Sequence, residues 1–150
     1  MEIAVVGGGA AGFFAAINVK ENYPDAEVFI FEKSKEVLSK VKVSGGGRCN
    51  LTNACSNSAA LSEAYPRGAK ALKRAFYHFD NKDTMNWFES RGVPLVVEEE
   101  GCVFPRSQNS QSVIDCFLEQ TRKLGVSIET GKGVKAVAEI NGKLHLTCVG

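Results

Sequence analysis

The segment from residue 44 to residue 53 combines groups that can hold a phosphate-bearing ligand. It reads Ser-Gly-Gly-Gly-Arg-Cys-Asn-Leu-Thr-Asn. The consecutive glycines Gly45, Gly46 and Gly47 let backbone N–H groups approach phosphate oxygens closely, and Arg48 adds a permanent positive charge. Such a run suits neither a helix interior nor a strand interior. We therefore interpret residues 44–53 as a ligand-binding loop.

A second glycine-rich turn lies near the N-terminus, where Gly7, Gly9 and Gly12 have the spacing of a dinucleotide-binding fingerprint. In that fingerprint the first glycine permits a tight turn, the second lets the backbone approach a pyrophosphate, and the third lets the following helix pack on its strand. Glu32 follows at the place where a carboxylate accepts hydrogen bonds from ribose hydroxyls. Two phosphate-binding turns favour a flavin nucleotide, although the fingerprint alone does not separate FAD from NAD.

The elements around the first turn predict a βαβ unit. Residues 3–6 form a continuous apolar run, typical of a strand buried on both faces. Residues 10–20 predict a helix, and residues 27–31 predict the next strand, which ends at Glu32. The helix N-terminus then offers free N–H groups to the phosphates.

The rest of the chain predicts a mixture of helices and short strands. Residues 33–57 read as a long polar loop that carries the second glycine run. Helices are expected over residues 68–79, 82–91 and from Ser110 or Ser112 to 124, with Asp80 or Asn81 capping the second. Short strands are expected at 95–97, 102–104 and 126–128. Asn141-Gly142 between residues 134–140 and 143–148 predicts a β-hairpin.

Composition limits the possible classes of protein. The length of 150 residues favours a single domain. The formal net charge of +1 gives the chain no general attraction to nucleic acid or to an anionic membrane. No apolar run is long enough to span a bilayer, and no signal peptide is expected. The five cysteines are odd in number and lack CxxC spacing. This pattern fits a reducing cytoplasm and argues against a disulfide framework or a metal site.

The segment 44–53, together with Glu32-Lys33 and residues 103–107, closely resembles the signature of the HI0933-like family of bacterial NAD(P)/FAD-dependent oxidoreductases. The resemblance extends over essentially the whole chain. It implies an α/β fold, namely a Rossmann-like, glutathione-reductase-type FAD-binding domain with an attached β-hairpin. It also implies that FAD is bound, that hydride moves through flavin N5, that NAD(P)H can be the electron donor, and that the substrate is a small molecule.

The resemblance places FAD on the fingerprint, with Glu32 on the adenosine ribose and residues 44–53 along the pyrophosphate, ribityl chain and flavin ring. The backbone of Val134 is expected to meet the adenine ring. The complete predicted cofactor-binding set is Gly7, Gly9, Ala10, Ala11, Gly12, Glu32, Lys33, Lys42, Ser44, Gly45, Gly46, Gly47, Arg48, Cys49, Asn50, Thr52 and Val134. No catalytic side chain is identified, because the cofactor carries the chemistry in such enzymes.

The resemblance also implies a longer family domain. Residues 1–150 correspond to the N-terminal part of an FAD-binding domain, and its remainder and an inserted second domain are expected to lie outside this sequence. An NAD-dependent Rossmann oxidoreductase and a non-catalytic FAD-fold module linked to RNA modification remain alternatives. Cys49 can be either a redox thiol beside Arg48 or a small residue packed in a tight loop.

Overall fold

The computed structural model describes residues 1–149, which divide into two compact units. The first unit comprises Met1–Val41 and the segment from Phe117 onward, and the second comprises Lys42–Cys116. Within the described residues, no helix has the length and apolar character needed to cross a membrane.

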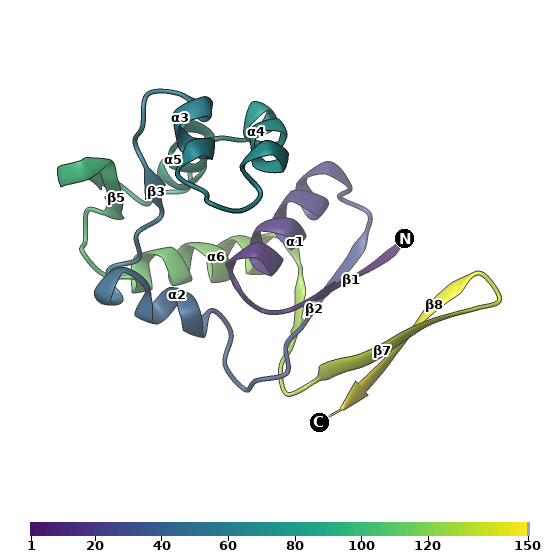
Figure 1. Cartoon of the computed structure of the whole chain (residues 1–150). Coiled ribbons are helices and arrows are strands. Elements are labelled where there is room, and N and C mark those ends of the chain that lie inside the picture. Colours follow the sequence, from purple (N-terminus) through teal and green to yellow (C-terminus); the bar gives the residue numbers. More distant parts are fainter. Residues whose placement is uncertain (150) are drawn as a thin grey trace. The chain divides into compact units, whose positions relative to one another are not determined.

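A three-stranded parallel sheet forms the centre of the first unit (Figure 1). Its strands are β1 (Glu2–Val6), β2 (Glu27–Phe31) and β6 (Ser127–Glu129), in the order β1-β2-β6. Helix α1 (Ala10–Asn22) connects β1 to β2 and packs on both. The predicted βαβ unit is therefore confirmed, and its register pairs Val5 with Ile30.

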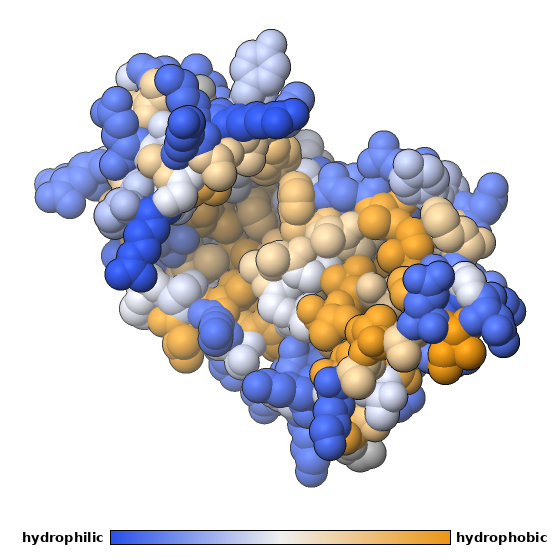
Figure 2. Space-filling view, turned by 45° about the vertical axis from the view of Figure 1, so that its right-hand side comes forward, coloured by the Kyte–Doolittle hydropathy of each residue, from blue (hydrophilic) through white to orange (hydrophobic). Residues whose placement is uncertain are grey.

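One face of this sheet holds the core of the first unit. Val28 and Ile30 of β2 are buried with Phe13 and Ile17 of α1. The prediction that β1 is buried on both faces is wrong in this structure, because Val6 remains 58% exposed. Since β1 is an edge strand here, it lacks a second neighbour among the described residues. Figure 2 shows hydrophobic residues (orange) at the surface of the protein beside hydrophilic ones (blue).

The predicted hairpin is confirmed as β7 (Gly133–Ile140) and β8 (Lys143–Val149), which pair antiparallel. Asn141 and Gly142 both have positive φ, at 53° and 73°. Positive φ at both central residues matches the twist of a two-residue hairpin turn, which is why Asn-Gly is favoured there.

The second unit has an antiparallel sheet in the order β3-β5-β4. Its strands are β3 (Thr52–Asn53), β4 (Leu95–Val97) and β5 (Cys102–Pro105), and its helices include α3 (Ser58–Glu63), α4 (Ala69–His78) and α5 (Asn81–Glu89). Asp80 caps α5 through a reciprocal capping box with Asp83, so of the two predicted caps, Asp80 and Asn81, the first is confirmed. A short 3-10 turn, η2 (Glu99–Gly101), joins β4 to β5.

Residues 33–57 are more ordered than the predicted loop. They contain α2 (Ser39–Val43), the 3-10 turn η1 (Ser44–Gly47) and β3. The amphipathic helix α6 (Gln111–Leu124) runs from the second unit into the first. The Ser110 hydroxyl does not cap α6 but donates a hydrogen bond to the Lys42 carbonyl at 2.9 Å.

Candidate functional site

The fingerprint glycines form a tight turn between β1 and α1. Gly7 has a φ of +111°, and its N–H donates to the Phe31 carbonyl at 2.8 Å. A Cβ at Gly12 would lie 1.9 Å from the Gly7 carbonyl oxygen, so only glycine lets α1 begin this close to the turn. A Cβ at Gly9 would meet nothing within 4 Å, which leaves open space beside the helix N-terminus.

The N-terminus of α1 can bind an anion. Gly9 is the N-cap residue, and no side chain caps the helix or places an acid in its first turn. The first N–H groups of a helix, here those of Ala10, Ala11 and Gly12, have no partner within the helix and carry its partial positive charge. A phosphate beside Gly9 would satisfy them.

Glu32 is held beside this turn by two backbone hydrogen bonds. Its Oε2 accepts from the Gly8 N–H at 2.7 Å, and its Oε1 accepts from the Ser34 N–H at 2.8 Å. The bonds from Ser34 and Gly8 lower the pKa of this carboxyl. Glu32 is therefore ionised near neutral pH, and its bond with Gly8 helps to fix the glycine turn. A carboxylate is the kind of acceptor that a ribose diol would need. The sequence pattern did not predict its bond to Gly8.

We expect Glu32 to make the stability of the protein depend on pH at its acidic end. Because the folded-state pKa lies below the ordinary value of 4.5, the stabilisation is present above 4.5 and is lost as pH falls through the folded pKa. The Tm difference between wild type and Glu32→Gln should therefore shrink as pH is lowered from 7 toward 3. Thermal unfolding followed by circular dichroism measures this difference. The control is Glu139→Gln, at an exposed position of β7. A Glu32→Gln difference that stays constant with pH would contradict the assignment.

The predicted residues Lys33 and Val134 lie near Glu32. Lys132 N–H donates to the Glu32 carbonyl, and Gly131 N–H donates to the Ser34 carbonyl, both at 2.9 Å. The start of β7 is thereby tied to the end of β2, and Val134 follows two residues after Lys132. The first unit thus brings the fingerprint, Glu32, Lys33 and Val134 into one region.

The loop predicted to bind the cofactor is a run of left-handed backbone in the second unit. Gly45, Gly46 and Gly47 have φ values of 55°, 67° and 85°, and Cys49 has a φ of 62°. Cys49 N–H donates to the Ser44 carbonyl, and Ser110 N–H donates to the Gly47 carbonyl. The positive φ values at residues 45–47 therefore explain why the sequence has three consecutive glycines there.

The other residues of this loop divide between surface and framework. Lys42 and Asn50 are exposed, whereas Thr52 pairs with Val103 in the β3–β5 ladder. The structure therefore places Lys42, Ser44 to Asn50 and Thr52 in the second unit.

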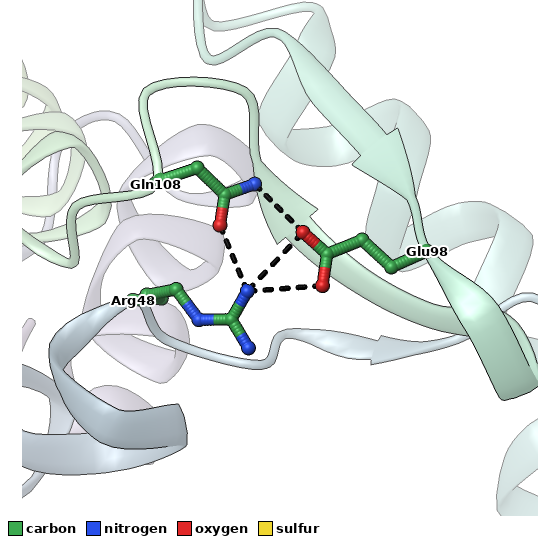
Figure 3. Close-up of polar contacts among 3 residues, drawn as sticks. All are labelled: Arg48, Glu98 and Gln108. Carbon is green, nitrogen blue, oxygen red and sulfur yellow. Dashed lines mark hydrogen bonds and ion pairs between the residues drawn. The ribbon is translucent and has the colours of Figure 1, made fainter.

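Arg48 is engaged by side chains that come from distant parts of the sequence (Figure 3). Its Nη1 donates to Glu98 Oε2 at 2.9 Å and to Gln108 Oε1 at 2.9 Å. Gln108 Nε2 in turn donates to Glu98 Oε1 at 2.9 Å, and the Arg48 Cζ lies 4.0 Å from the centre of the Phe104 ring. These partners lie 50 and 60 residues along the chain, so no local pattern could have predicted them.

A hollow of about 600 Å³ lies beside this cluster in the second unit. Its lining consists of Arg48, Val97, Glu98, Glu99, Cys102 and Phe104. The hollow therefore combines one guanidinium, two carboxylates and apolar surface, a combination that sequence reasoning did not identify.

Cys49 is a packed residue of the glycine loop. Its side chain is 6% exposed, and burial raises the pKa of its thiol, only partly offset by a hydrogen bond with the Ser44 side chain. A raised pKa means less thiolate near neutral pH, and the thiolate is the reactive form. The geometry thus favours packing over a redox role.

We expect Cys49 to resist alkylation in the native protein. Cys148 of β8 is exposed and serves as the internal reference. At pH 7.5 a short exposure to iodoacetamide should label Cys148 at least about tenfold faster than Cys49. Peptide mapping by mass spectrometry gives both rates, and unfolding in urea should equalise them. Equal native rates would instead support a reactive thiol at Cys49.

Comparison with known proteins agrees with this fold. The model of the HI0933-like protein Rossmann domain matches residues 1–149. The 3-dehydro-bile acid delta(4,6)-reductase of Clostridium scindens is 33% identical over 135 residues, which cover 90% of this chain and 32% of that protein. The ribosomal RNA dihydrouridine synthase of Escherichia coli is 26% identical over 90% of this chain and 32% of that protein. The chain thus spans about a third of the length of these relatives.

Two solved structures show the same fold at low identity. The 3-ketosteroid-delta4-(5alpha)-dehydrogenase of Rhodococcus jostii has a TM-score of 0.66 at 15% identity, covering 97% of this chain and 43% of that one. The FrdA subunit of E. coli quinol fumarate reductase has a TM-score of 0.67 at 14% identity, covering 99% of this chain and 29% of that one. With the family model matching nearly every residue, the chain belongs to the HI0933-like family.

Proposed function

We propose that this chain binds FAD and supplies the N-terminal part of the FAD-binding domain of an oxidoreductase. The observation that carries the proposal is the arrangement of the first unit. An uncapped helix N-terminus, open space at Gly9 and the ionised Glu32 lie around one turn. A pyrophosphate fits the first two features, and a ribose diol fits the carboxylate.

The second unit supports the proposal through its glycine loop. Gly46 and Gly47 leave room around their α-carbons, where a Cβ would come no closer to another atom than 4.0 Å. We propose that the backbone N–H groups of residues 45–47 donate to oxygens of the cofactor. The buried Ser110, which holds both Lys42 and Gly47, keeps this loop in place.

We propose that the reaction is the reduction of a ring carbon–carbon double bond conjugated to a carbonyl group. The curated relatives are a 3-dehydro-bile acid delta(4,6)-reductase and two ribosomal RNA dihydrouridine synthases, and reduction of a ring double bond would account for both kinds of name. FAD supplies hydride transfer through its N5. A hydride added to the carbon remote from the carbonyl and a proton added to the neighbouring carbon complete the reduction, with NAD(P)H as the proposed source of the electrons.

The role of the chain in this reaction is to bind and orient the cofactor. Glu32 fixes the position of the ribose, and the α1 N-terminus neutralises part of the pyrophosphate charge. These contacts hold FAD in one geometry, which reduces the entropic cost of bringing its reactive ring to the substrate.

The test is the visible spectrum of the full-length protein as purified, with chromatography of the released cofactor. Absorption maxima near ~370 and ~450 nm together with released FAD are expected for a bound flavin. Anaerobic addition of NADH or NADPH should then bleach the ~450 nm band. A colourless protein that cannot be reconstituted with FAD would refute the proposal and leave NAD binding as the leading interpretation.

RNA is a second candidate substrate, because two curated relatives at 26% identity are ribosomal RNA dihydrouridine synthases. The net charge of +1 argues against direct RNA binding by this chain. A gel-shift titration with ribosomal RNA at low salt decides between these interpretations. Absence of a shift would favour a small-molecule substrate.

A further inference from the structure

We infer that the hollow beside Arg48 binds the ring carbonyl group of a neutral substrate. In this assignment Arg48 donates hydrogen bonds to the carbonyl oxygen, and Glu98 and Gln108 are the positioning residues that hold its guanidinium. The inference rests on the proposed function, because it names the substrate group that would be recognised.

The first argument is the direction of the free donors of Arg48. Both hydrogens of Nη1 are used, since this nitrogen is bonded to the Glu98 carboxylate and to Gln108 (Figure 3). Within residues 1–149, Nε and Nη2 have no hydrogen-bond partner, and the side chain is still 41% exposed. The guanidinium therefore keeps one edge of N–H donors for a ligand that supplies an acceptor oxygen.

The second argument is how firmly that edge is oriented. Glu98 and Gln108 are bonded to each other as well as to Arg48, and the Phe104 ring covers one face of the guanidinium. Three non-glycine residues in or near this Arg48–Glu98–Gln108 cluster have a strained, left-handed backbone. They are Cys49, Glu100 and Gln108, with φ values of 62°, 60° and 55°. Such strain persists only where surrounding contacts enforce it, and it often accompanies binding sites.

The third argument is the charge balance, which indicates the class of ligand. Glu98 and Glu99 outnumber the single cation Arg48 in the lining, so the hollow disfavours an anion. Val97 and Phe104 offer apolar surface to a ring, and the exposed Glu99 can accept a hydrogen bond from a hydroxyl or N–H group. The volume of about 600 Å³ lies in the range of small-molecule sites. A neutral cyclic carbonyl compound meets all of these conditions.

The test is equilibrium dialysis of the full-length protein against 4-androstene-3,17-dione, used as a neutral ring ketone, and against benzoate as an anionic ring compound. We expect the ketone to bind and benzoate to bind at least about tenfold more weakly. Arg48→Lys keeps the charge but loses the planar edge, so the Kd for the ketone should rise about tenfold or more. Lys123→Gln breaks an exposed ion pair with Glu119 on α6 and should leave the Kd unchanged.

A double-variant cycle tests the role of Glu98. Glu98→Gln should raise the Kd about threefold or more in the wild-type background and have little effect in Arg48→Lys, because Glu98 acts through Arg48. Equal effects in both backgrounds would overturn the positioning role. Circular dichroism verifies that each variant is folded.

The cofactor content of the same samples separates this inference from the proposed function. Ketone binding that depends on Arg48 supports the site even in a preparation without FAD. A wild-type protein that retains FAD but binds benzoate as well as the ketone, or binds neither, overturns the inference and leaves the proposed function intact. Loss of FAD in Arg48→Lys without any change in ketone binding would assign the free edge to the cofactor and also overturn the inference.

Discussion

Gly12→Ala is expected to destabilise the protein by about 3 kcal/mol and to abolish stable FAD binding. The added Cβ would lie 1.9 Å from the Gly7 carbonyl oxygen and 3.4 Å from Val5 Cγ1. Both contacts belong to the turn between β1 and α1, so relief requires the helix to move away from the strand. That movement displaces the N–H groups of the first helical turn from the phosphate position that we propose. Urea unfolding measures the first effect, and the ~450 nm absorbance after reconstitution measures the second.

Gly9→Ala is the matched control for this prediction. Gly9 has a φ of −93°, which alanine adopts without strain, and its added Cβ would have no neighbour within 4 Å. Stability should therefore stay within about 0.5 kcal/mol of wild type. FAD affinity should nevertheless fall about tenfold or more, because the methyl group would occupy the space proposed here for the pyrophosphate. If Gly9→Ala bound FAD as well as the wild type, the cofactor would not approach this turn, and the proposed site would be wrong.

The local features of the fold could be predicted because short-range chemistry determines them. Asp80 caps α5 since its carboxylate reaches N–H groups two and three residues later. Asn141 and Gly142 form the hairpin turn since both tolerate positive φ. The fingerprint likewise predicted a strand, a turn and a helix, because each glycine has a local steric reason.

Features that depend on distant partners could not be predicted in this way. Glu98 and Gln108 look like ordinary polar residues in the sequence, and only the β-sheet and turns of the second unit bring them to Arg48. The exposure of Val6 depends on how many strands flank β1, which the apolar run itself does not encode. The order within residues 33–57 arises in part from Ser110, whose hydroxyl holds Lys42 from the other end of the second unit's sequence.

Gly45→Ala is expected to have the second large effect, a loss of about 3 kcal/mol that combines strain and a clash. Gly45 has a φ of +55°, and its added Cβ would lie 2.6 Å from the backbone nitrogen of Asn50 and 3.1 Å from Phe104 Cε1. Neither neighbour can move without disturbing the loop, because Phe104 is buried under the Arg48 guanidinium. The substitution should therefore also reduce FAD content, which absorbance of the purified variant measures.

Gly46→Ala separates the effect of backbone strain from the effect of the steric clash. Gly46 has a φ of +67°, so alanine there carries the same left-handed strain, but its Cβ would meet nothing within 4 Å. We expect a loss of only about 1 kcal/mol, measured by urea unfolding under the same conditions as Gly45→Ala. The difference between the two variants isolates the contact with Asn50 and Phe104, since the backbone cost cancels. Equal losses of unfolding free energy in the two variants would show that the loop rearranges at Gly45 to relieve the clash. A loop that rearranges so easily could not hold its backbone donors for the cofactor, or Arg48 for a substrate carbonyl, in the fixed geometry that these two proposals require.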